Sequence, residues 1–230
     1  MNEVRRHRIG LIGGLSWEST ATYYKYFNLL SAKKNNWSQP ELLIDSLNFG
    51  EIVPLQEKED WAATGEILSD SARRLEKAGA TVIGIGANTM HINFEAVQAA
   101  VQVPVVDVRS AVADEVVSRG FSKMALLGTK YVLEQSFYVD KLVARGVKVI
   151  LPDSGQIEKL QSIIFDELTQ GIVLAESKEF LIGVAEQSMA QGAQIVGLCC
   201  TEFGLLLDEN EIFPSVDSTK AHVRALLSYS

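Results

Sequence analysis

Short apolar runs alternate along the chain with longer stretches in which apolar residues recur at helical spacing. The runs are rich in Val, Ile and Leu, which predicts strands buried on both faces of a parallel sheet. The longer stretches predict helices that cover those faces. The predicted strands are 7–14, 41–49, 81–87, 103–108, 123–129, 147–152 and 194–200, and the predicted helices are 16–30, 61–78, 91–101, 111–118, 134–144, 157–169, 178–191 and 219–227.

The order of these elements restarts in the second half of the chain. IGLIGG at 9–14 resembles MALLGT at 124–129, and GATVIGIGANT at 79–89 resembles GAQIVGLCCTE at 192–202. Because the two pairs keep the same order and nearly the same offset, we expect two similar α/β domains with parallel sheets. The predicted domains are 1–108 plus 216–230, and 109–215.

Composition narrows the class of protein. The chain has 230 residues, 47% of them hydrophobic and 22% charged, which is enough to bury a core. Its net charge of −8 argues against a nucleic-acid or membrane-surface partner, since only Arg5, Arg6 and Arg8 form a basic cluster. No apolar run approaches the roughly 18–20 residues that cross a bilayer, and no signal-peptide core follows Met1. We therefore expect a cytoplasmic protein that acts on a small molecule.

The two cysteines of the chain, Cys199 and Cys200, are adjacent. Neighbouring Cα atoms lie about 3.8 Å apart, which is closer than the roughly 4.4–6.8 Å that a disulfide spans. Three histidines, His7, His91 and His222, show no spacing typical of zinc ligands, so no metal site is expected. Cys200 is then either a buried apolar side chain or a reactive thiol.

The internal repeat matches Ala87 with Cys200. Both positions end a predicted strand and precede small polar residues, and ligands of parallel sheets bind beyond such strand ends. We expect the two ends to face each other across a cleft. A helix after each strand would point N–H groups at a carboxylate there and lower the pKa of a thiol. Alternation along the strand directs Cys199 away from Cys200.

Five motifs, spread over nearly the whole chain, carry a family resemblance. They are IGLIGGLSWEST at 9–20, NTMH at 88–91, LLGTKYVLEQSFY at 126–138, IIFDEL with Gly171, and GLCCTEFGLLL at 197–207. In these motifs the chain resembles the aspartate/glutamate racemases, which are cofactor-independent amino-acid racemases. The resemblance implies two pseudo-symmetric Rossmann-like α/β domains with the active site in the cleft between them, usually in a homodimer. It also implies that no pyridoxal phosphate takes part.

The resemblance implies one catalytic cysteine after a strand in each domain. The second matches Cys200, whereas the first falls on Ala87, which has no proton to exchange. The implied activity is racemisation of aspartate and/or glutamate, in which Cys200 serves one face of the α-carbon and water or the Thr89 hydroxyl serves the other. Two alternatives stay open: a single-cysteine lyase or isomerase similar to the arylmalonate decarboxylases, and a catalytically weak carboxylate-binding protein.

Polar residues near the strand ends complete the candidate site. Asn88 and Thr89 are expected to bind a substrate carboxylate, and helix capping is the structural alternative. Since a Glu202 carboxylate alone would raise the pKa of the thiol, a positive group or a helix dipole is expected to lower it. The other candidates for substrate contact are Gly14, Ser16, Asn48, Ala87, Thr129, Lys130, Thr201 and Glu202, with His91 and Asp217 in supporting positions.

A dinucleotide-binding protein is the competing class. The glycines at 10, 13 and 14 follow a strand, but they do not form G-x-G-x-x-G, and Asp45 lies later than that fingerprint requires. No cofactor is therefore expected.

Overall fold

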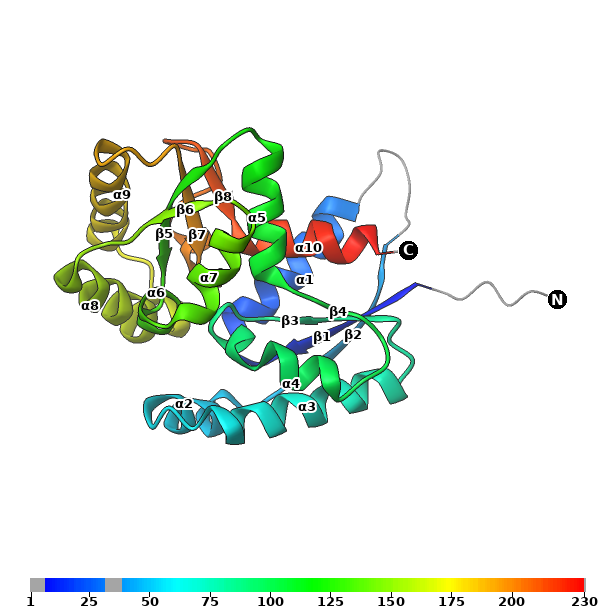
Figure 1. Cartoon of the computed structure of the whole chain (residues 1–230). Helices are drawn as coiled ribbons and strands as arrows, with labels where there is room; N and C mark the ends of the chain where they lie inside the picture. The colour runs from blue at the N-terminus through cyan, green and yellow to red at the C-terminus, as the bar shows by residue number, and fades with distance from the viewer. Residues whose placement is uncertain (1–6, 32–38, 230) are drawn as a thin grey trace. The chain divides into compact units, whose positions relative to one another are not determined.

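The computed structural model describes residues 7–31 and 39–229, and Figure 1 shows the order of their helices and strands. The strands are β1 (Arg8–Gly13), β2 (Glu41–Ser46), β3 (Val82–Ile85), β4 (Val105–Val106), β5 (Lys123–Gly128), β6 (Lys148–Ile150), β7 (Ile195–Cys199) and β8 (Ser215–Asp217). The α-helices are α1 (Trp17–Ser31), α2 (Phe49–Glu57), α3 (Trp61–Lys77), α4 (Phe94–Ala99), α5 (Val108–Ser118), α6 (Lys130–Glu134), α7 (Ser136–Ala144), α8 (Ser154–Ser162), α9 (Ala175–Ala190) and α10 (Ser218–Ser228). Short 3₁₀ segments are η1 (Thr89–Asn93), η3 (Leu168–Gln170) and η4 (Thr201–Leu205), and η2 (Ile163–Glu167) is a π segment.

The strands form two four-stranded parallel sheets, of order β2-β1-β3-β4 and β6-β5-β7-β8. The two orders are equivalent, so β1 corresponds to β5 and β3 corresponds to β7. The repeated sequences found in the two halves of the chain lie on these equivalent strands. The α/β fold class with two parallel sheets, which the sequence predicts, is thereby confirmed.

Contacts divide the chain into two units. Unit 1 comprises 1–86, 92–107 and 222–230, and unit 2 comprises 87–91 and 108–221. The short segment 87–91 thus belongs with unit 2, although it directly follows β3 of the first sheet. The domain boundaries given above from the sequence stay a prediction.

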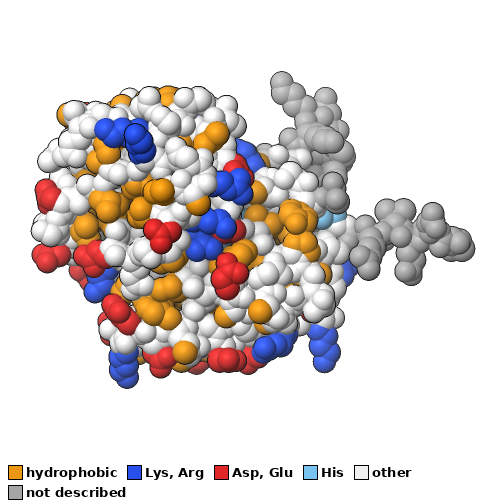
Figure 2. Space-filling view, viewed as in Figure 1, with side chains coloured by type: hydrophobic (Ala, Val, Ile, Leu, Met, Phe, Trp, Pro, Cys, Tyr) orange, Lys and Arg blue, Asp and Glu red, His pale blue; other side chains and the backbone are white. Residues whose placement is uncertain are grey.

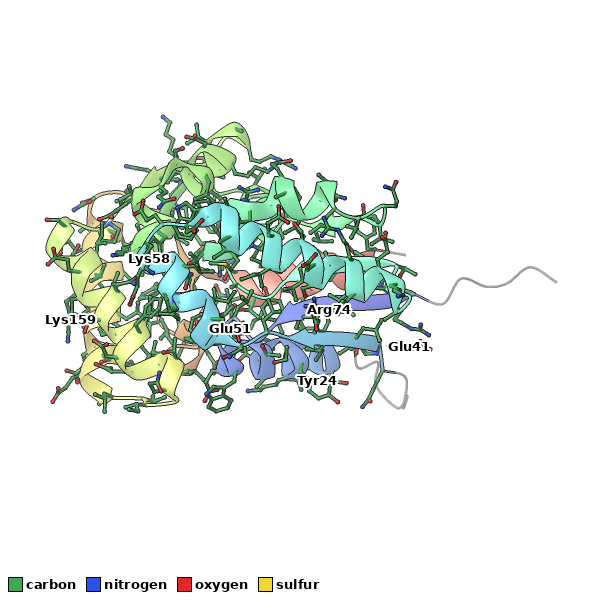
Figure 3. The ribbon with its side chains drawn as sticks, turned by 90° about the horizontal axis from the view of Figure 1, so that it is seen from below. Tyr24, Glu41, Glu51, Lys58, Arg74 and Lys159 are labelled. Atoms are coloured by element: carbon green, nitrogen blue, oxygen red, sulfur yellow. The ribbon has the colours of Figure 1, made fainter. Side chains whose placement is uncertain are left out.

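In unit 1, helices cover both faces of the sheet. One face packs against α1 and the last turns of α10, in a cluster that includes Leu11, Phe27 and Leu226. On the other face, a Cβ added to Gly10 would lie 3.3 Å from Cβ of Leu75, so α3 packs closely against β1. Arg74 of α3, labelled in Figure 3, also donates to Asp45 of β2.

In unit 2, the two faces of the sheet have separate cores. One core joins β5 and β7 to α8, η2 and α9, and the other joins them to α5 and α7 (Figure 1). Because neighbouring residues of a strand point to opposite faces, Ala125 and Leu127 belong to the first core, whereas Met124 and Leu126 belong to the second. The same alternation separates Cys199, the last residue of β7, from Cys200, which directly follows it.

Several elements differ from the sequence-based expectation. The three-residue strand β8 was not predicted, since so short a run has no readable period. Helix α2 was not predicted either, because Pro54 lies inside it and proline disfavours helix interiors. The helix expected at 134–144 is preceded by a separate short helix, α6.

The surface carries both charges. On the face shown in Figure 2, acidic and basic side chains are interspersed with apolar ones. No helix in the described part of the chain is long and apolar enough to cross a membrane.

Replacing Gly14 with alanine should destabilise unit 1 strongly. Gly14 has φ +69, and an added Cβ would lie 2.0 Å from the carbonyl oxygen of Leu47. Gly120→Ala is the matched control, because Gly120 has φ +79 but no described atom lies within 4 Å of the added Cβ. Left-handed backbone costs a side chain about 1–2 kcal/mol, which is the loss expected for Gly120→Ala in urea unfolding. Gly14→Ala should lose at least about 3 kcal/mol, because overpacking adds to that cost. Equal losses would contradict this account of Gly14.

Candidate active site

The candidate residues of unit 2 gather at the carboxyl ends of its central strands. β5 and β7 pair in parallel up to Gly128 and Cys199, so Thr129 and Cys200 leave the sheet at the same edge. The segment 87–91 also reaches Thr129, because Thr89 Oγ1 and Thr129 Oγ1 form a buried hydrogen bond of 2.8 Å. Unit 2 by itself therefore places hydroxyl groups, a thiol and a carboxylate where parallel sheets bind ligands.

Cys200, Thr201 and Glu202 form a compact hydrogen-bonded group. The Cys200 thiol donates to Oε2 of Glu202 over 3.0 Å, and Thr201 Oγ1 donates to the same oxygen over 2.6 Å. Cys200 is 6% exposed and Glu202 is 4% exposed. The local cause is the change from extended backbone at Cys200 to the 3₁₀ segment η4, which turns Glu202 back toward the thiol. The result is a thiol and a carboxylate in contact and shielded from water.

This environment favours the neutral thiol. Burial raises the pKa of Cys200 well above its ordinary value of 9.0, and the Glu202 carboxylate raises it further. The expectation that a positive group or a helix dipole lowers this pKa is therefore wrong. The partner of the thiol is an anion, and the helical segment that follows is a short 3₁₀ stretch of 5 residues.

Cys199 points into the opposite core, as alternation along the strand predicts. It is fully buried among residues of α5, α7 and β5, whereas Cys200 packs on the side of α8 and α9. Burial raises the pKa of Cys199 to about 12, hydrogen bonding to Tyr138 lowers it, and the charge of Asp217 raises it. Cys199 is thus a protonated thiol on the far side of the strand from the candidate catalytic group.

The side chain of Asn88 is held at both ends. Its Oδ1 accepts a hydrogen bond of 2.9 Å from the hydroxyl of Tyr138, and its Nδ2 donates to Oγ of Ser218 over 2.9 Å. These contacts join the loop after β3 to α7 and to the start of α10. Asn88 therefore connects parts of the structure. One of the two hydrogens on its Nδ2 takes part in neither of these bonds.

His91 fixes the backbone of the same loop. The backbone N–H of Val108 donates to Nε2 over 3.2 Å, so the ring hydrogen lies on Nδ1, which donates to the carbonyl oxygen of Ala87 over 2.8 Å. This contact orients Ala87, the position matched with Cys200. A supporting position for His91 is what the sequence predicted, and its effect on catalysis stays a prediction.

Asp217 lies at the start of α10. Its Oδ1 accepts from the backbone N–H groups of Thr219 and Lys220 at 2.8 and 3.2 Å, which caps the helix. Burial raises the pKa of Asp217 to about 6, although Lys220 and these N–H groups lower it. Within the described residues, no group of three His, Cys, Asp or Glu side chains is placed to hold a metal ion.

Lys130 is exposed and lies at the start of α6. Its ammonium group is 5.1 Å from the ring centroid of Tyr131, a cation–π contact. Its backbone N–H donates to Gln161, while Thr129 caps the helix. Neutralisation of substrate charge by Lys130 therefore stays a prediction.

The remaining candidates, Gly14, Ser16 and Asn48, belong to unit 1. Ser16 Oγ accepts from the N–H of Ser19 over 3.0 Å at the start of α1. Asn48 caps α2 by accepting from Gly50 N–H over 3.1 Å and donates to Glu51, which is labelled in Figure 3. These contacts are local, and substrate binding by the three residues stays a prediction.

Sequence reasoning missed Tyr138 and Ser218. Both contact Asn88, but Tyr138 is 50 residues away and Ser218 is 130 residues away in sequence. Tyr138 ends the motif LLGTKYVLEQSFY, and Ser218 directly follows the candidate residue Asp217. Both residues therefore lie in or beside segments that the sequence singled out, but a single sequence has no signal for contacts between residues so far apart along the chain.

Comparison with known proteins identifies the family. The sequence model of the Asp/Glu/Hydantoin racemase family matches residues 12–226 of the chain. The chain belongs to this family. Racemases are isomerases, and the resemblance drawn from the five motifs is confirmed.

Individual racemase relatives match over nearly their full length. The chain is 25% identical over 228 residues to the broad specificity amino-acid racemase RacX of Bacillus subtilis (strain 168), with 96% of each protein covered. A structure from Yersinia pestis, assigned to the Asp/Glu racemases, has a TM-score of 0.87 and 36% identity over 97% of this chain and 98% of that one. An aspartate racemase homologue from Pyrococcus horikoshii OT3 has a TM-score of 0.82 and 37% identity over 96% of this chain and 97% of that one.

Thiolate absorbance should test the state of Cys200. We expect no thiolate signal in the native protein until the pH exceeds 9.0, because burial and Glu202 keep the thiol neutral. Glu202→Gln removes the negative charge but keeps the shape, so its thiolate should form at lower pH. The Cys199→Ser background isolates the signal of Cys200. A thiolate at neutral pH in that background would contradict the assignment.

Asp217 should make stability depend on pH. Its pKa rises from 3.8 to about 6 on folding, so the native state retains a proton that the unfolded state has lost. The resulting stabilisation is present at low pH and is lost as the pH rises through about 6. At about 1.4 kcal/mol per unit, the loss amounts to about 3 kcal/mol. Asp217→Asn should therefore gain most of that, about 2.4 kcal/mol, relative to the native sequence between pH 4 and pH 7 in urea unfolding. An unchanged difference between the two proteins would rule out a raised pKa.

Proposed function

We propose that this protein is a cofactor-independent racemase of aspartate and/or glutamate, in which Cys200 transfers the α-proton. The observation that carries the proposal is the buried contact between the Cys200 thiol and the Glu202 carboxylate. It provides a group that holds a proton at neutral pH and, 3.0 Å away, an acceptor for that proton. The family supplies the reaction class, and the amino acids are those named by the relatives.

The proton steps follow from this pair. When Cys200 acts as the base, its proton passes from Sγ to Oε2 of Glu202, and the resulting thiolate takes the α-proton of the substrate. A thiol with a raised pKa gives a strongly basic thiolate. A strong base is what removal of a proton from a weakly acidic C–H bond requires. When Cys200 acts as the acid, Sγ–H gives its proton to the planar α-carbon. The thiolate is then neutralised by a proton from solvent, because in this direction no proton has passed to Glu202.

The opposite face of the α-carbon requires another proton donor. Ala87 has no exchangeable proton, and the hydroxyl of Thr89 bonds to that of Thr129. We assign this face to a water molecule held by the Thr89 hydroxyl. This water protonates carbon and leaves as hydroxide, which the proton taken up by Glu202 neutralises when it passes to solvent. Asn88, Thr129 and Thr201 offer further donors for the substrate carboxylate. The homodimer and the cytoplasmic location expected from the sequence are part of the same proposal.

A second candidate function has an observation in its favour. Neither Ala87 nor Thr89 has a side chain that titrates near neutral pH. Of the three residues Ala87, Thr89 and Cys200, Cys200 alone therefore has an ionisable group that can carry the α-proton. This asymmetry favours a single-thiol lyase or isomerase, similar to the arylmalonate decarboxylases. A carboxylate-binding protein with weak catalysis is the limiting case.

Exchange of the α-hydrogen is the decisive measurement. The protein is incubated in D₂O with L- and D-aspartate and L- and D-glutamate, without added cofactor. Deuterium uptake is followed by NMR and enantiomer ratio by chiral chromatography. We expect uptake with inversion, and we expect Cys200→Ala to lower the rate at least about 100-fold, which is the usual contribution of a general acid–base group. Cys199→Ser, which changes the neighbouring thiol on the other face of the strand, should retain exchange.

The outcomes separate the candidates. Uptake with retained configuration would support one-sided chemistry by Cys200 in place of racemisation. No uptake from any of the four amino acids, followed by decarboxylation of a substituted malonate, would support the lyase. Unchanged exchange in Cys200→Ala would overturn the role given to the thiol.

A further inference from the structure

The amide of Asn88, in the loop after β3, is held by hydrogen bonds at both its oxygen and its nitrogen. Asn88 is buried, and its oxygen and nitrogen face different partners, the Tyr138 hydroxyl and Ser218 Oγ, each at 2.9 Å. The amide torsion of asparagine has a broad energy profile. Its direction is therefore set by these partners and not by the side chain itself.

Tyr138 has a defined direction as a donor. It is fully buried in the core of α5 and α7, and its hydroxyl gives its hydrogen to Asn88 Oδ1. The donor–acceptor distance of this hydrogen bond is 2.9 Å.

The direction of the Tyr138 hydrogen bond decides which atom of the Asn88 amide faces each partner. With Oδ1 committed to Tyr138, the Nδ2 group must face Ser218, and it has two hydrogens of which Ser218 accepts one. The second N–H is left for a ligand. It lies on the residue next to Thr89, whose hydroxyl bonds to Thr129, so the loop presents N–H and O–H groups and no acidic side chain.

We propose that Tyr138 is a positioning residue that sets the direction of the Asn88 amide, so that one Nδ2–H is available to the carboxylate of the substrate. The inference rests on the proposed function for the identity of the ligand, but the direction of the amide does not depend on it. Tyr138 acts through Asn88 and does not itself touch the substrate.

The test compares Tyr138→Phe with the unaltered protein. Phenylalanine keeps the ring in its core but leaves Oδ1 of Asn88 without a donor, which frees the amide to turn. Tyr24→Phe is the matched control, because Tyr24 is 54% exposed on α1 of unit 1 (Figure 3). Ser218→Ala and the double variant Tyr138→Phe/Ser218→Ala complete a cycle, in which two contacts to one amide should be non-additive.

Two readouts are needed. The first is the ¹⁵N side-chain amide signal of Asn88, assigned from its loss in Asn88→Ala, with its exchange rate in water. The second is the dissociation constant for L-aspartate and L-glutamate, measured by calorimetry in the Cys200→Ala background, together with KM and kcat in active protein. We expect Tyr138→Phe to shift the Asn88 signal, to speed its exchange and to weaken binding about tenfold, as for loss of a hydrogen bond to a charged group. KM should rise while kcat changes little, since the contact is made in the ground state and the transition state alike.

The two readouts test two separate claims, the positioning role of Tyr138 and the binding of the substrate carboxylate by Asn88. An unchanged Asn88 signal in folded Tyr138→Phe would overturn the positioning role. A shifted signal with unchanged affinity for both amino acids would overturn the link to the substrate carboxylate. A fall in kcat with constant KM would also contradict it. If neither amino acid binds to any variant, the proposed substrate is wrong, while the Asn88 signal still shows whether Tyr138 directs the amide.

Discussion

The site depends on the parallel pairing of β5 with β7. Because the register runs without interruption to Gly128 and Cys199, the next residues of both strands leave the sheet at one edge. A shift of one residue would turn Cys200 to the other face, where it would meet the core that now holds Cys199. The direction of the Cys200 side chain, on which its proposed chemistry depends, is therefore set by backbone hydrogen bonds between β5 and β7.

The thiol and carboxylate at this edge raise an energetic question, because burial and the Glu202 carboxylate both oppose ionisation of the Cys200 thiol. The protein meets this by keeping one proton on the pair: the thiol donates and the carboxylate accepts. Thr201 adds a second donor to the same carboxylate oxygen, which offsets the cost of burying that charge. The thiol therefore stays protonated beside the carboxylate, and the proposed catalysis moves that proton to the carboxylate or to carbon.

The sequence predicted much of this arrangement because the information was local. Strand runs, helical spacing and the repeat between the two halves indicated two parallel sheets, and the CCTE motif indicated which thiol faces the site. Prediction failed where the outcome depended on three-dimensional neighbours. Whether the pKa of Cys200 rises or falls depends on burial and on the approach of Glu202. The task of Asn88 depends on Tyr138 and Ser218, which are distant in sequence. β8 has only 3 residues, so its pairing with β7 and not its own pattern makes it a strand.

The repeat also explains why the two halves differ at more than one position. It matches Ala87 with Cys200 and Thr89 with Glu202, so the first half lacks both the thiol and the carboxylate. A carboxylate at position 89 without a thiol to donate to it would be a buried charge with a missing partner, which is costly. Two hydroxyl groups that bond to each other, Thr89 and Thr129, avoid that cost. Thr89 in place of a carboxylate is therefore compatible with Ala87 in place of a thiol. Restoring a proton carrier to the first half would require a thiol at 87 and an acceptor for its proton, in a loop whose backbone His91 already holds in place.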